Sequence, residues 1–341
     1  MMSMRRVRWG AFLLVMSLFC VSPALAAQQS IDDLKRAAEN GDAAAQFELG
    51  TRYFDGDGVM RNPVEAEKLL RSAAEQGLPQ AQFNLALIYD AGRGVEKNVV
   101  EAANWYKKAA GQGIAEAQSN LGFLYRDGDG VAKDLAQAAF WFRKAAEQGN
   151  ARAQLALADA LFKGDGVTKN PQEALLQYRF AAVQGRVKAQ LALGDIYFFG
   201  LTGEKNMREA QIWYQKAAEK GNAEAQLRLG DILQREDPAY AIELYRKSAE
   251  QGNARAQLNL GNIYNAQLRV TAEDPNNDRE AVVWYRKAAE QGVAEAQFNL
   301  GTMYFNGQGV VRQEVEAVKW LKKAADQGMP EARQQLQAIL K

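Results

Sequence analysis

The chain has 341 residues, with 42 lysines and arginines against 41 aspartates and glutamates, and it has no histidine. Its one cysteine, Cys20, lies in the first 26 residues, so zinc sites of cysteine and histidine and the Ser-His-Asp and Cys-His catalytic arrangements are excluded. The near-neutral charge provides no basic surface for a phosphate backbone. We therefore expect a protein with no enzymatic activity, no cofactor, no metal site and no nucleic-acid partner.

Residues 1–26 have the organisation of a secretory signal peptide. Three arginines precede an apolar run over residues 11–21, and Ala24-Leu25-Ala26 supplies the small residues of a cleavage site. The run is too short to span a membrane as a helix, although an uncleaved anchor is the alternative interpretation. We expect cleavage after Ala26 and a periplasmic or secreted mature chain with no integral membrane span. Because that mature chain has no cysteine, we expect no disulfides.

A recurring glycine divides the rest of the chain into repeats of about 36 residues. The anchors are Gly41, Gly77, Gly113, Gly149, Gly185, Gly221, Gly252, Gly292 and Gly328. Counted from each anchor, an alanine follows at offset 4, a leucine at offset 8, and a glycine or alanine at offset 9 in every repeat but the last. The sixth repeat lacks five residues and the seventh gains four, and their later offsets are counted on the common register. Such a period predicts a solenoid, in which each unit buries its apolar face against its neighbours.

Each repeat predicts two helices. Small or apolar residues at offsets 4, 8 and 12 indicate a first helix, and a Gly-x-Gly turn such as Gly164-Asp165-Gly166 closes it. A second helix opens at offset 21 on asparagine or aspartate, as at Asn170, which Pro171 follows at the first helical position. Offset 28 of the second helix carries every tryptophan beyond the signal segment, and we expect these side chains to pack as wedges between repeats: Trp105, Trp141, Trp213, Trp284 and Trp320.

The repeated motif A-x-A-Q-x-x-L-G-x-x-Y-x-x-G-x-G-V, followed by A-x-x-W-Y-x-K-A-A-E-Q-G, resembles the Sel-1-like repeat, a relative of the tetratricopeptide repeat. The resemblance implies an all-α, right-handed α/α solenoid of eight helix pairs, with the first helices lining the concave side. It also implies a scaffold or adaptor, and bacterial members are commonly exported and take part in envelope regulation or host interaction. The expected organisation is a signal peptide at 1–26, capping helices at 27–40 and 328–341, and eight repeats at 41–327.

Offsets 3, 7, 10 and 14 of the first helices form what we call the polar stripe. They fall within about 60° of one another around a helix, and they carry variable, mostly polar residues. Since the other helix faces are apolar, we expect the stripe to face the open side and to bind another protein or an extended peptide. The candidate partner-binding residues are Asn84, Asn120, Phe199, Arg228, Asn259 and Asn299.

Each candidate has a second interpretation. The asparagine amides could pair with a peptide backbone, or equally satisfy neighbouring helices. Phe199 is either an apolar anchor or packs against the turn at Leu201, and Arg228 has carboxylates within its own helix. The irregular loop of the seventh repeat, near Asn265 to Asp278, is either a further binding surface or tolerated drift.

The sequence thus predicts an exported, non-enzymatic scaffold that mediates protein–protein interaction through the concave groove. The alternative is a cell-wall or polysaccharide-associated binding protein, or an envelope hydrolase. Clustered tryptophan or tyrosine side chains on the polar stripe would favour that alternative, because aromatic rings stack on sugars.

Overall fold

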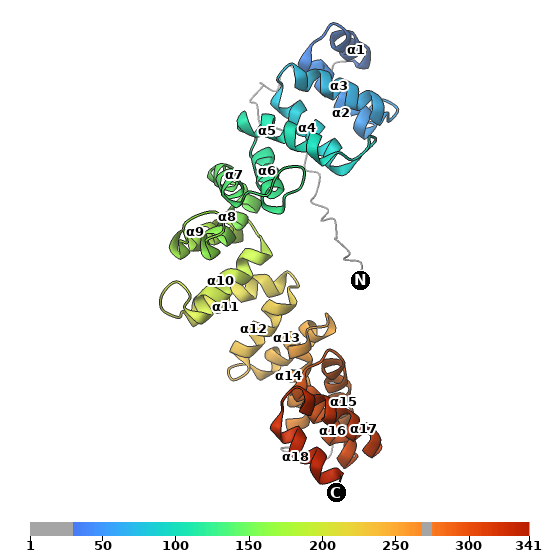
Figure 1. Ribbon diagram of the computed structural model, residues 1–341, viewed down its shortest axis with the longest axis vertical. Helices are drawn as coiled ribbons and strands as arrows, with labels where there is room; N and C mark the ends of the chain where they lie inside the picture. Colours follow the sequence, from blue (N-terminus) through green and yellow to red (C-terminus); the bar gives the residue numbers. More distant parts are fainter. Residues whose placement is uncertain (1–29, 268–274, 341) are drawn as a thin grey trace. The chain divides into compact units, whose positions relative to one another are not determined.

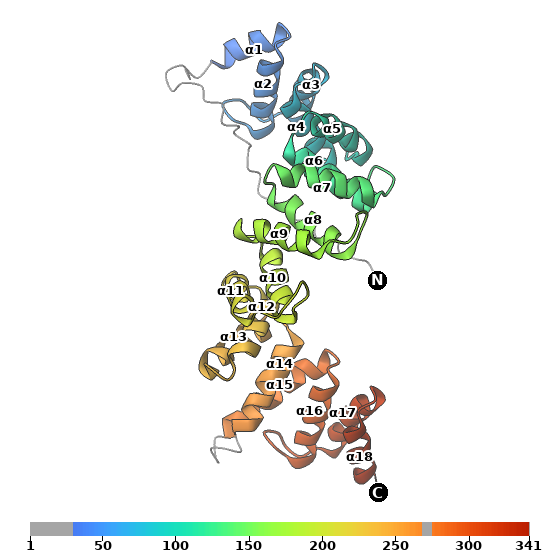
Figure 2. The same cartoon turned by 90° about the vertical axis from the view of Figure 1, so that its left-hand side faces the viewer.

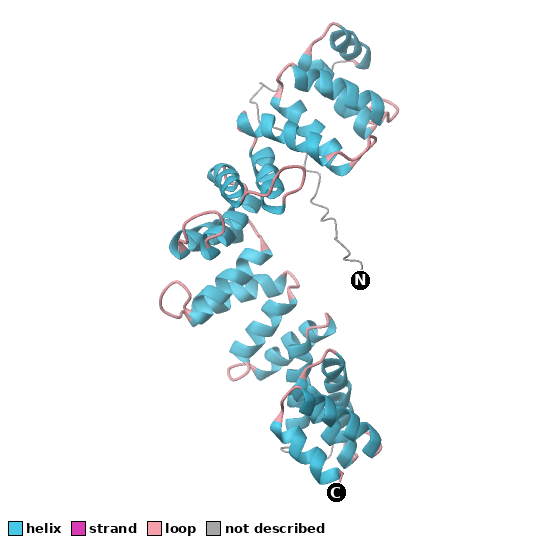
Figure 3. Ribbon diagram, in the orientation of Figure 1, coloured by secondary structure: helices cyan, strands magenta, loops and turns pink. Residues whose placement is uncertain are grey.

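A computed structural model describes residues 30–267 and 275–340. Within these two ranges every regular element is an α-helix, and loops join the helices (Figure 3). The predicted signal peptide and residues 268–274, the middle of the irregular loop of the seventh repeat, lie outside the described residues. In the part of the chain that is described, no helix has the length and apolar character needed to cross a membrane.

Eighteen helices follow one another in the described ranges, and Figure 1 labels them in chain order. Helix α1 (Ile31–Glu39) precedes the first repeat and α18 (Pro330–Ile339) follows the last. The first helices of the repeats are α2 (Ala43–Asp55), α4 (Pro79–Ala91), α6 (Ala115–Asp127), α8 (Ala151–Lys163), α10 (Val187–Phe199), α12 (Ala223–Leu233), α14 (Ala254–Gln267) and α16 (Ala294–Asn306). The second helices are α3 (Pro63–Glu75), α5 (Val99–Gly111), α7 (Leu135–Glu147), α9 (Pro171–Val183), α11 (Met207–Glu219), α13 (Pro238–Glu250), α15 (Pro275–Glu290) and α17 (Glu314–Asp326).

The described helices fall into two compact units, the first with α1 to α4 and the second with α5 to α18. In the first unit α1 packs on α2, α2 pairs with α3, and α3 packs on α4. In the second unit each helix from α5 to α17 packs on the next one (Figure 2), so each helix pair is covered by the helix or pair that follows it. The prediction of an all-α solenoid of eight helix-pair repeats is confirmed.

The predicted helix ends are also confirmed. Asn170 caps α9, because its side chain accepts the backbone N–H of Glu173 at 3.1 Å. Gly164 ends α8 in the left-handed conformation, with φ of 87°. The second glycine of this turn, Gly166, is also left-handed, with φ of 72°, and a Cβ there would lie 2.1 Å from the carbonyl oxygen of Leu135 at the start of α7. The Gly-x-Gly turn therefore closes one helix and contacts the preceding repeat.

A buried glutamine at offset 5 joins each repeat to the one before it. Its Nε2 donates to the carbonyl of the alanine three residues before the anchor glycine, as Gln154 does to Ala146. Its Oε1 accepts from the glutamine that precedes the next anchor glycine, as Gln154 does from Gln184 at 2.8 Å. The same glutamine pairs are Gln76–Gln46, Gln148–Gln118, Gln251–Gln226, Gln291–Gln257 and Gln327–Gln297, each at 2.8 Å. Because these groups are buried, the pairs satisfy polar atoms that would otherwise be costly.

The fifth repeat breaks this pattern at Lys220. Its ammonium donates to the carbonyl of Gly185 at 2.9 Å, as Gln184 does to Gly149, but the buried Oε1 of Gln190 has no hydrogen-bond partner. We predict that Lys220→Gln raises the free energy of unfolding by about 1 kcal/mol, because it supplies the missing donor to a buried acceptor.

Denaturant unfolding of both proteins measures this difference. The control is Lys322→Gln, the same change at an exposed position of α17, which we expect to alter stability by less than about 0.5 kcal/mol. Equal stability of the Lys220→Gln variant and the parent would show that the lysine already satisfies Gln190.

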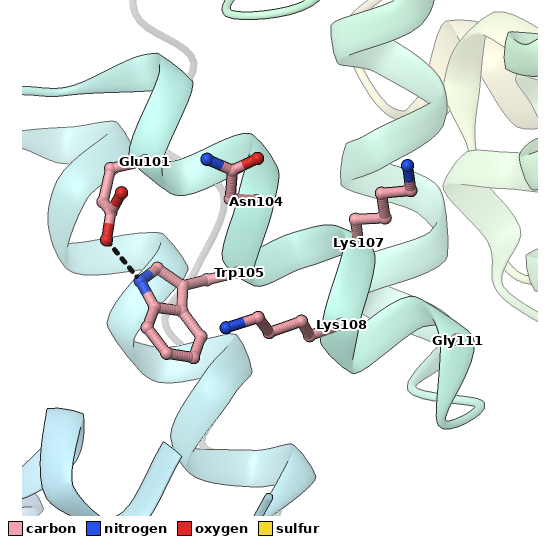
Figure 4. A pocket seen from close by; sticks show the side chains of 6 residues that line it. All are labelled: Glu101, Asn104, Trp105, Lys107, Lys108 and Gly111. Carbon is pink, nitrogen blue, oxygen red and sulfur yellow. Dashed lines mark hydrogen bonds between the residues drawn. The ribbon is translucent and has the colours of Figure 1, made fainter. Parts of the chain in front are cut away.

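Four of the five tryptophans expected to be wedges are buried: Trp105, Trp213, Trp284 and Trp320. Each donates its indole N–H to the glutamate four residues earlier, and the lysine three residues later lies over its ring. Figure 4 shows this arrangement on α5, where Trp105 donates to Glu101 at 2.8 Å and the Lys108 ammonium lies 3.7 Å from the ring centroid.

Trp141 differs from these four. Gln137 stands where they have glutamate, the indole nitrogen has no hydrogen-bond partner, and the ring is only half-buried. Its ring instead meets Phe140 edge to face, with centroids 5.0 Å apart. The second helix of the third repeat therefore holds its tryptophan by a different set of contacts.

Candidate interaction surface

The polar stripe is accessible in the structure. Its described side chains are exposed or half-buried, except for Ala156. Consecutive first helices also pack directly on one another, as α10 does on α12 and α14 on α16. The stripe therefore continues from one repeat to the next within the second unit, and a ligand lying along it would touch several repeats.

Three of the four candidate asparagines bind neighbouring repeats. Asn120 accepts from the Arg152 guanidinium at 2.8 Å. Asn259 and Asn299 each donate to the offset-10 residue of the preceding repeat, in the Asn299 case to Asn262 at 3.3 Å. The fourth, Asn84, is a half-buried residue of α4 in the first unit. The structure thus brings these three asparagines into a hydrogen-bond network between first helices. A ligand could bind to the lone pairs and N–H groups of each amide that this network does not use.

The offset-10 residues are held by tyrosines of the second helices, a contact that we did not predict. Tyr178, Tyr214 and Tyr245 donate to an aspartate at offset 10 of their own repeat, and Tyr285 donates to an asparagine there. In the third repeat the same two offsets carry Phe123 and Phe142, whose rings pack at 4.8 Å. In the third to seventh repeats, a polar residue at offset 10 thus meets tyrosine and the apolar residue meets phenylalanine. The second repeat, with Leu87 and Tyr106 at these offsets, departs from this matching, so the sequence pattern did not predict the contact.

Two of the candidate residues, Phe199 and Arg228, lie next to each other. The Arg228 guanidinium carbon is 5.7 Å from the centroid of the Phe199 ring, and its Nε is 2.9 Å from a carboxylate oxygen of Glu224. Phe199 is 45% exposed although its ring packs edge to face on Phe198 at 4.9 Å. An accessible aromatic ring beside a paired arginine is the composition typical of interface hot spots.

Asp195 lies beside this pair and is partly removed from water. Burial raises the pKa of its carboxyl, the hydrogen bond from Tyr214 and the charge of Arg228 oppose the rise, and the charge of Glu224 adds to it. The Tyr214 hydroxyl donates to Asp195 at 2.7 Å. Burial likewise raises the pKa of Tyr214, so the tyrosine remains a donor throughout the neutral range.

These shifts predict a pH dependence of stability. A carboxyl whose pKa is raised in the folded state contributes stability that is present below its unfolded-state pKa of about 4. This stability is lost as the pH rises through its folded-state pKa. Asp195→Asn removes this loss while keeping an acceptor for Tyr214, as Asn262 does for Tyr285. We therefore expect the difference in melting temperature, variant minus parent, to be larger at pH 7 than at pH 4.

Thermal melts at the two pH values measure the effect. The control is the reverse change, Asn262→Asp. It should lower the melting temperature below that of the parent more strongly at pH 7 than at pH 4. Parallel pH profiles for the parent and both variants would contradict the assigned environment of Asp195.

A hollow of about 540 Å³ lies beside Trp105, and all the residues that line it belong to α5 (Figure 4). Glu101 and Lys108, the charged groups nearest the ring, are already engaged with it. Because a single helix supplies the described lining, the described residues bring no groups from a second element to a ligand there. The polar stripe remains the better candidate.

The helix pairs, the buried joints between them and the stripe of variable residues define an α/α solenoid of the kind that presents a surface for other molecules. The chain belongs to the Sel1 repeat family. The Sel1 repeat model matches residues 43–78, 79–114, 115–150, 151–185, 187–222, 223–253, 254–293 and 294–329. Sel1 repeat proteins are generally non-catalytic scaffolds for protein–protein interaction.

Two solved structures extend this likeness over most of the chain. A Sel1 repeat protein from Oxalobacter formigenes is 33% identical, with a TM-score of 0.66 over 90% of this chain and 89% of that one. A protective antigen present in uropathogenic Escherichia coli strains is 36% identical, with a TM-score of 0.53 over 90% of this chain and 82% of that one. A search among curated proteins gave no match.

Proposed function

We propose that the protein is an exported, non-enzymatic scaffold that binds another protein, or an extended peptide, along the polar stripe. The observation that carries the proposal is the accessible stripe itself, which runs over successive first helices and includes an exposed aromatic ring beside an arginine. Family membership supports a protein partner. The residues 1–26 support export.

The stripe has the chemistry to hold a polypeptide. Amides, carboxylates and guanidinium groups alternate along it, so it offers both donors and acceptors to a peptide backbone. Phe199 adds one apolar contact, and its edge-to-face packing on Phe198 holds the ring in place. A partner with an extended segment and one large apolar side chain would satisfy both features.

The setting that we propose is the bacterial envelope or its contact with a host. A protein known as a protective antigen must meet the immune system, and the antigen of uropathogenic E. coli is similar to this chain over 90% of its length. The alternative function, binding of cell-wall glycan or polysaccharide, is less well supported, since none of the described stripe residues is tryptophan or tyrosine.

Two measurements test the proposal. Cell fractionation followed by N-terminal sequencing should find the mature chain outside the cytoplasm, beginning near Ala27. Affinity capture with the mature chain from an envelope extract should recover one protein reproducibly, and isolated peptidoglycan should not retain the chain. A cytoplasmic, uncleaved chain would refute export, whereas retention on peptidoglycan with no protein partner would favour the alternative.

A further inference from the structure

The fourth repeat lacks the tryptophan wedge. At offset 28, where five repeats have tryptophan, it has Gln177. The first and sixth repeats fill the same position with an apolar side chain, Leu69 and Leu244, and Leu244 is buried. Gln177 is therefore the one polar residue among the eight at this position.

A hollow of about 290 Å³ lies at Gln177. Its lining includes Arg143, Ala146 and Glu147 of α7, Gln154 and Leu157 of α8, and Gln177 and Phe180 of α9. Pockets that enclose drug-sized ligands have volumes of about 300–1,000 Å³, so this one is of the size for a single large side chain. It opens between two second helices, on a different surface from the polar stripe.

In other repeats the equivalent space is filled by the chain's own indole. Trp213, Trp284 and Trp320 each belong to a buried cluster that contains the alanine three residues before the anchor glycine of their repeat and the leucine eight residues after it. In the fourth repeat those two residues are Ala146 and Leu157, and both line the hollow. The hollow is thus the place from which an indole ring is missing.

The polar groups around the hollow still suit an indole. The buried Oε1 of Gln177 has no hydrogen-bond partner, and an indole N–H is a donor without an acceptor of its own. Glu173 occupies the position of the glutamates that accept the indole N–H in other repeats, but here it pairs with Arg143 and accepts from Asn170. Gln177 on α9 and Glu147 on α7 are therefore the acceptors beside the hollow for an incoming N–H group, and Gln177 is the one at the offset of the missing indole.

Two exposed apolar side chains of α9, Phe180 and Val183, have no apolar counterpart in the other repeats, and Phe180 lines the hollow. Leu176, Phe180 and Val183 lie on one side of α9 and are 48%, 47% and 77% exposed. At the offset of Phe180 the other repeats have serine or lysine, and at the offset of Val183 they have glutamate, aspartate or glycine. Exposed apolar side chains grouped around a pocket are typical of a binding surface.

We propose that the hollow between α7 and α9 is a binding site for the indole side chain of a tryptophan from a partner polypeptide. The ring lies against Ala146 and Leu157, its N–H donates to Oε1 of Gln177, and the flanking residues of the partner pack on Leu176, Phe180 and Val183. The site is separate from the polar stripe, so it stands or fails independently of the function proposed for that surface.

The test uses N-acetyl-L-tryptophanamide as the probe and the whole mature chain. Saturation-transfer NMR should show binding of this probe, with a dissociation constant on the order of 1 mM, and no binding of N-acetyl-L-alaninamide. Gln177→Trp places the chain's own indole in the hollow. It should weaken probe binding at least tenfold and raise the melting temperature by about 2–4 °C, because it fills a cavity.

The matched control is Gln172→Trp, the same change at an exposed position of α9, which should leave probe binding and the melting temperature unchanged. If Gln177→Trp does not fold, Gln177→Met decides the matter. It removes the acceptor at similar volume, and probe binding should fall about three- to tenfold. Absence of probe binding to the parent chain, or parental affinity in both Gln177 variants, would overturn the proposal.

Discussion

Trp284→Ala is expected to lower the free energy of unfolding by about 3–5 kcal/mol. The side chain is 5% exposed, it shares a buried cluster with Ala249 and Leu260, and its indole N–H donates to Glu280. Truncation leaves a cavity between the sixth and seventh repeats and removes the hydrogen bond to Glu280. Thermal and denaturant unfolding of the purified chain measure the loss.

The effect should also be local. Since each repeat contacts only its neighbours, amide hydrogen exchange should accelerate most in helices α12 to α16. Trp141→Ala is the matched control, because that ring is half-buried and its nitrogen has no hydrogen-bond partner. We expect it to cost clearly less than Trp284→Ala, and the reverse order would mean that the wedge positions do not carry the contacts assigned to them.

Gly261→Val is the second change with a large expected effect, a loss of about 3 kcal/mol. A Cβ at this position would lie 2.5 Å from two ring carbons of Tyr285, which is fully buried and donates to Asn262. The valine can be accommodated only if α14 and α15 separate or the tyrosine leaves its rotamer. Either change weakens the packing within the seventh repeat.

Gly111→Val is the control for this prediction, because a Cβ there would have no atom within 4 Å. Unfolding curves of the two variants should differ by more than about 2 kcal/mol. Equal stabilities would show that the helices of a repeat can separate at little cost.

The fold was largely predictable because each local signal occurs several times. The cap at Asn170, the turn at Gly164 and the alanine and leucine positions have counterparts in most repeats, so an ambiguous signal in one unit is resolved by the others. The pairing of Gln184 with Gln154 was not predicted, although both glutamines recur in the motif. It joins residues 30 positions apart, one on α8 and one at the end of α9, and helical periodicity does not indicate which side chains meet between helices.

The sequence predicted which side of the first helices carries the candidate site, but not the contacts that the residues of the site make. Helical periodicity placed the polar stripe on the accessible side, where the structure has it. Whether Asn259 meets a ligand or its neighbour Asp231 depends on the spacing of consecutive first helices, which a repeat length does not determine. The hollow at Gln177 was missed for a similar reason: the missing tryptophan was visible in the sequence, but its consequence depends on the side chains of α7 that surround the position.

The most direct measurement of the central claim is the affinity of the captured partner for the double variant Phe199→Ala, Arg228→Ala. If the polar stripe is the binding surface, the dissociation constant should rise about thirtyfold or more, since a hot spot is worth about 2 kcal/mol, while the melting temperature stays close to that of the parent. Val315→Ala, at a residue of α17 that is 82% exposed and lies off the stripe, should bind like the parent. Parental affinity in the double variant, or a loss of binding in Val315→Ala, would contradict the account.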